Sequence, residues 1–156
     1  LPVSPLFLQL SEMIASAFQI FLYGILYIQI VRLLGWGFTG NFLQYTVALF
    51  FASFFVAGFS LAYTALVPRK WSSVLGSLLM MFILFFGGMV GPPMMFHGTP
   101  LEALANLNVA QILTGPFLAV NLGTFSLHSL RLFLIGTVVS IGLTAAIERM
   151  KKGAFR

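Results

Sequence analysis

Long apolar runs, separated by short breaks rich in glycine or proline, dominate this chain of 156 residues. A helix needs about 20 apolar residues to cross the ~30 Å hydrocarbon core of a bilayer, and helices are favoured there because they satisfy their own backbone hydrogen bonds. The pattern predicts an all-α integral membrane protein with a single transmembrane domain. We expect four transmembrane helices, at about residues 13–34, 42–67, 71–91 and 130–147.

Composition supports this prediction. Hydrophobic residues make up 60% of the chain and charged residues 7%, where about 25% charged is typical of soluble domains. These values exclude a soluble enzyme, a disordered tail, a coiled coil and a secreted disulfide scaffold. The absence of cysteine excludes disulfides and thiolate metal sites. The net charge of +5 does not indicate nucleic-acid binding, because the basic residues lie at the ends of apolar runs.

The distribution of basic residues predicts the topology. Six of the eight lie in two places: Arg69, Lys70, Arg149, Lys151, Lys152 and Arg156. An even number of crossings must separate these two places if both are cytoplasmic. The spans 71–91 and 130–147 already supply two, so we expect region 94–127 to dip in and return on the outer side. It would form a re-entrant or interfacial helical hairpin, with Gly115, Pro116 and Gly123 as the residues that allow the break. A fifth full span with an outer C-terminus is the alternative.

Small residues recur at four-residue spacing within the predicted spans. They are Ala48, Ala52, Gly58, Ala62, Gly87, Gly91, Gly136, Ser140 and Thr144. Small side chains let helices approach closely inside a bilayer. We expect this spacing to serve packing within the chain, with a dimer face as the alternative.

Few polar residues carry candidate chemistry. Gln19 and Tyr23 share a helix face, which suits either a polar path or hydrogen bonding between helices. His97, Glu102 and His128 are the reactive groups expected on the outer side, and a membrane-embedded enzyme would need them to converge. Their spacing matches no metal signature, so outer-loop surface residues are the favoured interpretation.

Several segments together resemble an ABC type-2 permease, the membrane subunit of many bacterial ABC exporters. LPVSP at 1–5 resembles the stretch that follows the family's first cytoplasmic coupling segment, and SEMIASAFQIFLYGILYIQIVRLLG resembles its third span. Residues 48–95, which end in GGMVGPPMM, resemble the fourth span, the cytoplasmic turn and the fifth span. The resemblance covers the C-terminal two-thirds of such a permease. Two further spans and a coupling helix would then precede Leu1.

The resemblance implies a transport subunit that is not itself an enzyme. Two permease subunits, identical or paralogous, would pair in the bacterial inner membrane with two cytoplasmic ATP-binding subunits. ATP and Mg²⁺ would bind to those partners, and this chain would hold no cofactor. The positions that map to the cytoplasmic docking and coupling face are Leu1, Pro2, Val3, Ser4, Pro5, Arg69, Lys70 and Trp71.

The resemblance also places span 71–91 beside the substrate path. Leu79, Phe82, Phe86 and Val90 form a stripe at helical spacing, and Gln19 and Tyr23 are further candidates for the path. Such an apolar, aromatic stripe suits an amphipathic or lipidic substrate. The alternative is that the stripe faces lipid or neighbouring helices. Two other functions stay open: a non-transporting scaffold subunit of a membrane complex, and an enzyme that uses the outer-face His97, Glu102 and His128.

Overall fold

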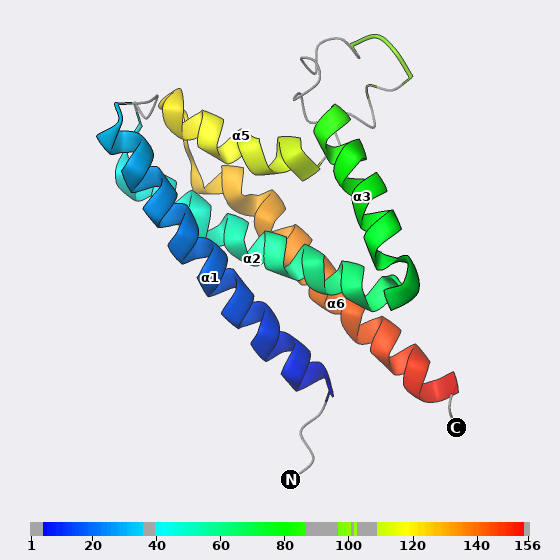
Figure 1. Cartoon of the computed structure of the whole chain (residues 1–156). Helices are drawn as coiled ribbons and strands as arrows, with labels where there is room; N and C mark the ends of the chain where they lie inside the picture. The colour runs from blue at the N-terminus through cyan, green and yellow to red at the C-terminus, as the bar shows by residue number, and fades with distance from the viewer. Residues whose placement is uncertain (1–4, 36–39, 87–96, 101, 103–108, 155–156) are drawn as a thin grey trace.

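The computed structural model describes residues 5–35, 40–86, 97–100, 102 and 109–154. In this part of the chain every regular element is helical, as predicted (Figure 1). The elements are α1 (Pro5–Leu33), α2 (Phe42–Leu66), α3 (Arg69–Phe86), α5 (Val109–Asn121), the short 3₁₀ helix η2 (Leu127–Leu130) and α6 (Arg131–Ala154).

Helices α1, α2 and α6 lie side by side, with α2 packed against both of the others (Figure 1). Helix α2 runs antiparallel to α1 and parallel to α6. The beginning of α1 and the end of α6 therefore lie at the same end of the molecule. Helix α5 crosses the opposite end, and α3 stands to one side of the three long helices (Figure 1).

Three helices in the described part are long and apolar enough to cross a membrane: Leu6–Leu33, Phe42–Leu66 and Leu127–Lys151. These helices are compatible with a membrane protein. The predicted fourth span at 71–91 overlaps α3, which is described only as far as Phe86, and residues 87–91 lie outside the described part. A count of four spans therefore remains a prediction.

Two helices extend beyond the spans predicted from the sequence. Helix α1 begins at Pro5 and not near residue 13, because proline is tolerated in the first turn of a helix and no glycine or proline interrupts residues 6–12. Helix α6 continues to Ala154 beyond the predicted end at 147. Its last turns are rich in glutamate, arginine, methionine and lysine, which favour helix. The bounds of α2 differ from the predicted ones by a single residue at its C-terminal end.

The region predicted as a re-entrant hairpin is only partly described. Helix α5 has 13 residues and is about 20 Å long, too short for a full crossing. It continues through Gly115 and Pro116, two of the three residues expected to allow a break, and the chain turns at the third, Gly123, whose φ is +70°. Most of 94–108 lies outside the described residues, so the second arm of the hairpin remains a prediction.

The core lies along both sides of α2. Against α6, the cluster of Ala48, Ala52, Phe55, Leu130 and Phe133 is buried. Against α1, a second cluster contains Met13, Ala17, Ala57 and Leu61.

The small-residue spacing serves packing within the chain at every predicted position that the structure describes. A Cβ on Gly136 would lie 2.2 Å from the Phe55 ring, and Ser140 and Thr144 are buried. Gly87 and Gly91 lie outside the described residues.

Candidate functional site

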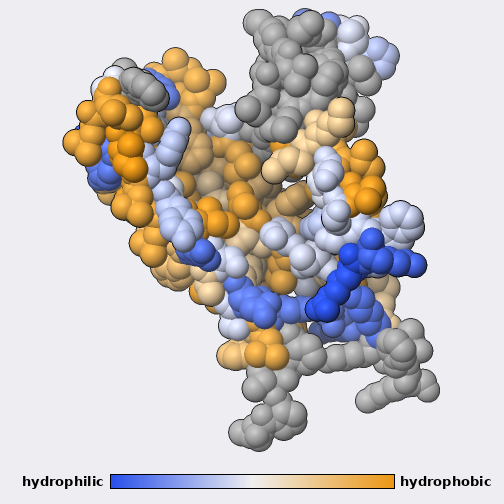
Figure 2. Space-filling model, viewed as in Figure 1, coloured by the Kyte–Doolittle hydropathy of each residue, from blue (hydrophilic) through white to orange (hydrophobic). Residues whose placement is uncertain are grey.

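Four helices converge at the end of the molecule where α1 begins and α6 ends. A polar cavity of about 370 Å³ lies between them. It is lined by Gln9, Glu12, Leu61, Thr64, Ala65, Val67, Arg69, Ser72, Glu148 and Lys151. Figure 2 shows hydrophilic residues gathered towards this lower end, around the end of α2, the start of α3 and the last turns of α6. We call this region the basic end.

Lys151 ties three helices together at the basic end. Its Nζ donates a hydrogen bond to the Ala65 carbonyl oxygen at 3.2 Å and lies 3.7 Å from Oε1 of Glu148. Glu148 Oε1 also accepts a hydrogen bond from Gln9 Nε2 of α1 at 3.4 Å. Ala65 belongs to the last turn of α2, where carbonyl groups lack partners within the helix. The lysine therefore caps α2 and links it to α6, and Glu148 extends the link to α1.

This contact brings the two basic stretches of the sequence to one end. Arg69 and Lys70 follow α2 by three and four residues, and Lys151 touches the last turn of that helix. The topology prediction required this arrangement. The opposite end holds the end of α1, the start of α2 and α5, as Figure 1 shows.

The predicted docking residues also lie at the basic end where they are described. Arg69, Lys70 and Trp71 form the first turn of α3 and are exposed, and α1 begins at Pro5. Leu1, Pro2, Val3 and Ser4 lie outside the described residues. The docking role itself stays a prediction.

The residues of the predicted stripe on α3 do not all lie on the half-buried face of the helix. The half-buried positions of α3 are Ser72, Gly76, Leu79 and Ile83, whose spacing of four, three and four residues defines one helix face. Leu79 belongs to this face, whereas Phe82 is 39% exposed. The side chain of Phe86, and Val90 altogether, lie outside what the structure describes.

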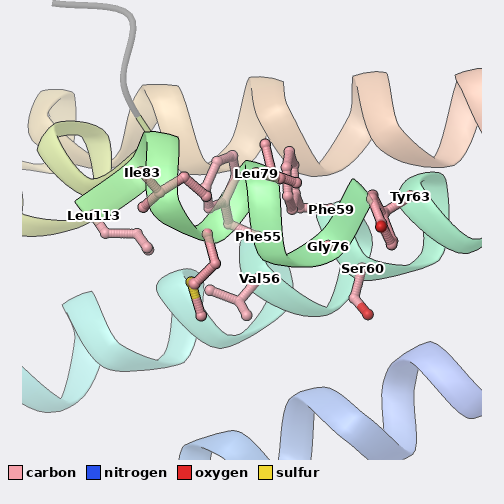
Figure 3. Close-up of a pocket in the computed structure, with 10 residues that line it drawn as sticks. Phe55, Val56, Phe59, Ser60, Tyr63, Gly76, Leu79, Ile83 and Leu113 are labelled. Atoms are coloured by element: carbon pink, nitrogen blue, oxygen red, sulfur yellow. The ribbon is translucent and has the colours of Figure 1, made fainter. Parts of the chain in front are cut away.

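The half-buried face of α3 borders an apolar cavity of about 330 Å³. Its lining comes from α2, α3 and α5: Phe55, Val56, Phe59, Ser60, Tyr63, Gly76, Leu79, Met80, Ile83 and Leu113. In Figure 3, Phe55 and Phe59 of α2, Leu79 and Ile83 of α3, and Leu113 of α5 lie around this space. None of these side chains is charged.

Gln19 and Tyr23 share a face of α1, as their spacing predicts. Gln19 Nε2 donates to Tyr23 Oη at 3.4 Å, and both side chains are exposed. No described part of the chain encloses a path along these exposed side chains, and their place beside a substrate path stays a prediction.

The candidate residues of the outer-face enzyme converge only in part. His97 Nδ1 lies 2.8 Å from Glu102 Oε1, and the Gly98 N–H donates to Glu102 Oε2 at 2.9 Å. The backbone hydrogen bond, followed by the His97 contact, lowers the pKa of the Glu102 carboxyl below its ordinary value. His128 lies in η2. Among the described residues, no three His, Asp or Glu side chains lie close enough together to hold a metal ion.

Sequence reasoning missed two parts of the site. The first part is the group formed by Gln9, Glu12 and Glu148. The sequence held two signals for it: two of the three acidic residues of the chain lie in the first and last helices, and Glu148 lies three residues before Lys151, a spacing that suits an ion pair on one helix face. Tyr63 was also missed. Its hydroxyl donates to the Ser72 carbonyl oxygen at 2.8 Å and joins α2 to α3, a contact for which local sequence gives no signal.

No protein-family model, curated protein or solved structure matches this chain.

Proposed function

We propose that this chain belongs to the permease subunit of an ATP-binding-cassette exporter. In this proposal its helices contribute to the substrate path across the bacterial inner membrane. A separate cytoplasmic subunit binds ATP and Mg²⁺ and hydrolyses the nucleotide. A second permease subunit, identical or paralogous, completes the membrane part.

The hydrogen bond from Lys151 to Ala65 is the observation that carries the proposal. It holds the 69–71 turn and the last turns of α6 together at the basic end of the molecule. The start of α1, in the stretch that resembles the one following the family's first coupling segment, lies at that same end (Figure 1). A cytoplasmic ATP-binding subunit would thus meet all three at one surface. Exposed Arg69 and Lys70 suit an acidic surface on such a partner.

The packing of α3 supports a role in coupling. Helices α1, α2 and α6 are joined by buried clusters and by Lys151, whereas α3 faces α2 across the apolar cavity. A push on the exposed first turn of α3 would move this helix without breaking the packing between α2 and α6. The substrate path would then change shape on the α3 side.

Charge reversal of the docking turn tests the proposal. The Arg69→Glu/Lys70→Glu variant is expected to lose co-purification with an ATPase that bears Walker motifs, and to lose stimulation of its ATPase activity. Arg131→Glu is the matched control, because Arg131 is exposed and begins α6 at the opposite end. Circular dichroism should show unchanged helix content in both variants.

Two results would contradict the proposal. Unchanged association and ATPase stimulation in the double variant would remove the docking role of this turn. If no such ATPase associated with the unsubstituted protein, the transport function would fall and the scaffold alternative would stand.

A further inference from the structure

The apolar cavity between α2 and α3 has a composition that suits a ligand of one kind. Its polar side-chain groups are the hydroxyls of Ser60 and Tyr63, and the Tyr63 hydroxyl already donates to Ser72. The rest of the lining is aromatic or aliphatic apart from Gly76 and the thioether of Met80. Water in such a space would lack hydrogen-bond partners, whereas apolar ligands readily occupy cavities of this kind.

Tyr63 lies at the end of the cavity nearest the docking turn, where its ring approaches α3. A Cβ on Gly76 would lie 3.1 Å from Tyr63 Oη, so the tyrosine ring and the α3 backbone are already close. Beyond this contact Leu79 and Ile83 face α2 without closing the space, and Leu113 of α5 borders its far end (Figure 3). The result is an elongated apolar slot parallel to α3.

A positive charge lies just beyond the Tyr63 end of this slot. Arg69 and Lys70 are exposed in the first turn of α3, and Arg69 precedes Gly76 by seven residues, about 10 Å along a helix. Trp71, also in this turn, is 52% exposed, and tryptophan favours the membrane–water interface. A ligand with an apolar tail in the slot would thus place its polar head beside two cations at the interface.

The molecule that combines these properties in a bilayer is a phospholipid with an anionic headgroup. We propose that the slot binds one acyl chain of an anionic phospholipid from the leaflet at the basic end, and that Arg69 and Lys70 hold its phosphate. This inference does not rest on the transport proposal, because lipid binding needs neither an ATPase nor a substrate.

Photolabelling of the unsubstituted protein tests the position of the acyl chain. Phosphatidylglycerol with a diazirine on one acyl chain would be added at low mole fraction in phosphatidylcholine nanodiscs, irradiated, and the labelled peptides sequenced. Labels are expected on Phe59, Leu79 and Ile83 above the level at Leu78, which is 58% exposed and does not line the slot. Uniform labelling around α3 would overturn the proposal.

A matched pair of variants tests the slot itself. Leu79→Trp should fill it and abolish retention of phosphatidylglycerol in native mass spectra, whereas Leu78→Trp should retain the lipid. Equal retention in both variants would contradict the proposal. A different combination would also contradict it: no acyl-chain label in the slot, together with a dimer of the protein that Leu79→Trp dissociates. In that case a second copy of the chain would occupy the slot.

Removal of the charges tests the headgroup contact. In a mixture of phosphatidylglycerol and phosphatidylcholine, Arg69→Gln/Lys70→Gln should lose a preference for the anionic lipid of about fivefold per basic residue. Binding of phosphatidylcholine should persist. An unchanged preference would refute the role of these two residues, and all three measurements are made without the ATP-binding partner.

Discussion

Helix α2 packs against α6 and α3 in two different ways. On the α6 side Ala48 and Phe133 are fully buried, and Gly136 lies directly against the Phe55 ring. On the α3 side a cavity of about 330 Å³ remains, and α3 exposes large side chains such as Leu78 and Met81. In lipid, burying an apolar side chain brings little gain, so the closeness of two helices depends on the size of the residues between them.

The contact residues explain the difference. The α2–α6 contact has alanine and glycine on α2 (Ala48, Ala52 and Gly58) and glycine, threonine and serine on α6 (Gly136, Thr137 and Ser140), and these let the backbones approach. On its half-buried face α3 has a glycine at position 76, and this glycine meets the bulky Tyr63. The protein therefore combines a closely packed unit of α1, α2 and α6 with a helix that has room to move.

The largest expected effect comes from overfilling the close contact. Gly136→Leu would force side-chain atoms into the buried Phe55 ring and should lower the free energy of unfolding by about 3 kcal/mol. Gly142→Leu, on the same helix, is the control, because nothing lies within 4 Å of a Cβ there. Unfolding by SDS in mixed micelles, followed by circular dichroism, measures both. Equal stability of the two variants would mean that α2 and α6 are not closely packed.

A pair of truncations compares the two sides of α2 directly. Phe55 is 5% exposed and its ring centroid lies 5.7 Å from that of Phe133, whereas Phe59, one turn further on, is only half-buried beside the cavity. In soluble cores Phe→Ala costs about 3–5 kcal/mol, but in a bilayer the unfolded reference is also apolar, so we expect about 2 kcal/mol for Phe55→Ala. Phe59→Ala should cost clearly less in the same SDS titration. A reversed order would show that the α3 side is the tighter one.

The sequence predicted the helical class and the small residues at which α2 and α6 pack closely. Apolar runs located α2 almost to the residue, and small-residue spacing correctly indicated the close contact at Ala48, Ala52 and Gly136. Helix ends were harder, because proline at position 5 and the charged residues after 147 are compatible with helix as well as with loop. Pro116 shows the same ambiguity, since it lies buried inside α5 and does not end that helix.

The candidate site was less predictable. The charge pattern placed both basic stretches on one side, and the contact between Lys151 and Ala65 agrees with this. The pairing of Glu148 with Gln9 and of Tyr63 with Ser72 depends on how helices are rotated about their axes. Apolar residues surround most of α3, so its sequence did not identify which face meets α2.

A smaller effect is expected from the hydrogen bond that joins α2 to α3. Tyr63→Phe removes the donor to the Ser72 carbonyl oxygen and should cost about 0.6 kcal/mol, the average for hydrogen bonds between helices in a bilayer. Because the chain has no cysteine, spin labels at Leu66→Cys and Ser77→Cys would report the α2–α3 distance specifically. The distance distribution should broaden in Tyr63→Phe and stay unchanged in Tyr27→Phe, which alters an exposed side chain of α1. An unchanged distribution in both variants would show that Tyr63 does not restrain α3.

The smallest expected effect lies outside both contacts of α2, in the 97–102 turn. The Gly98 N–H and His97 lower the pKa of Glu102, so the ionised carboxylate stabilises this turn above the ordinary glutamate pKa of about 4.3. The stabilisation is lost as the pH falls through the lowered value. The ¹⁵N–¹H resonance of Gly98 should therefore shift with a midpoint below 4.3 and lose this transition in Glu102→Gln. The Gly58 resonance, inside the close α2–α6 contact, should not follow this transition. A midpoint for Gly98 at the ordinary glutamate pKa would mean that the backbone hydrogen bond does not hold the carboxylate. A Gly58 resonance that shifted with the same midpoint would mean that the turn and the α2–α6 contact are coupled.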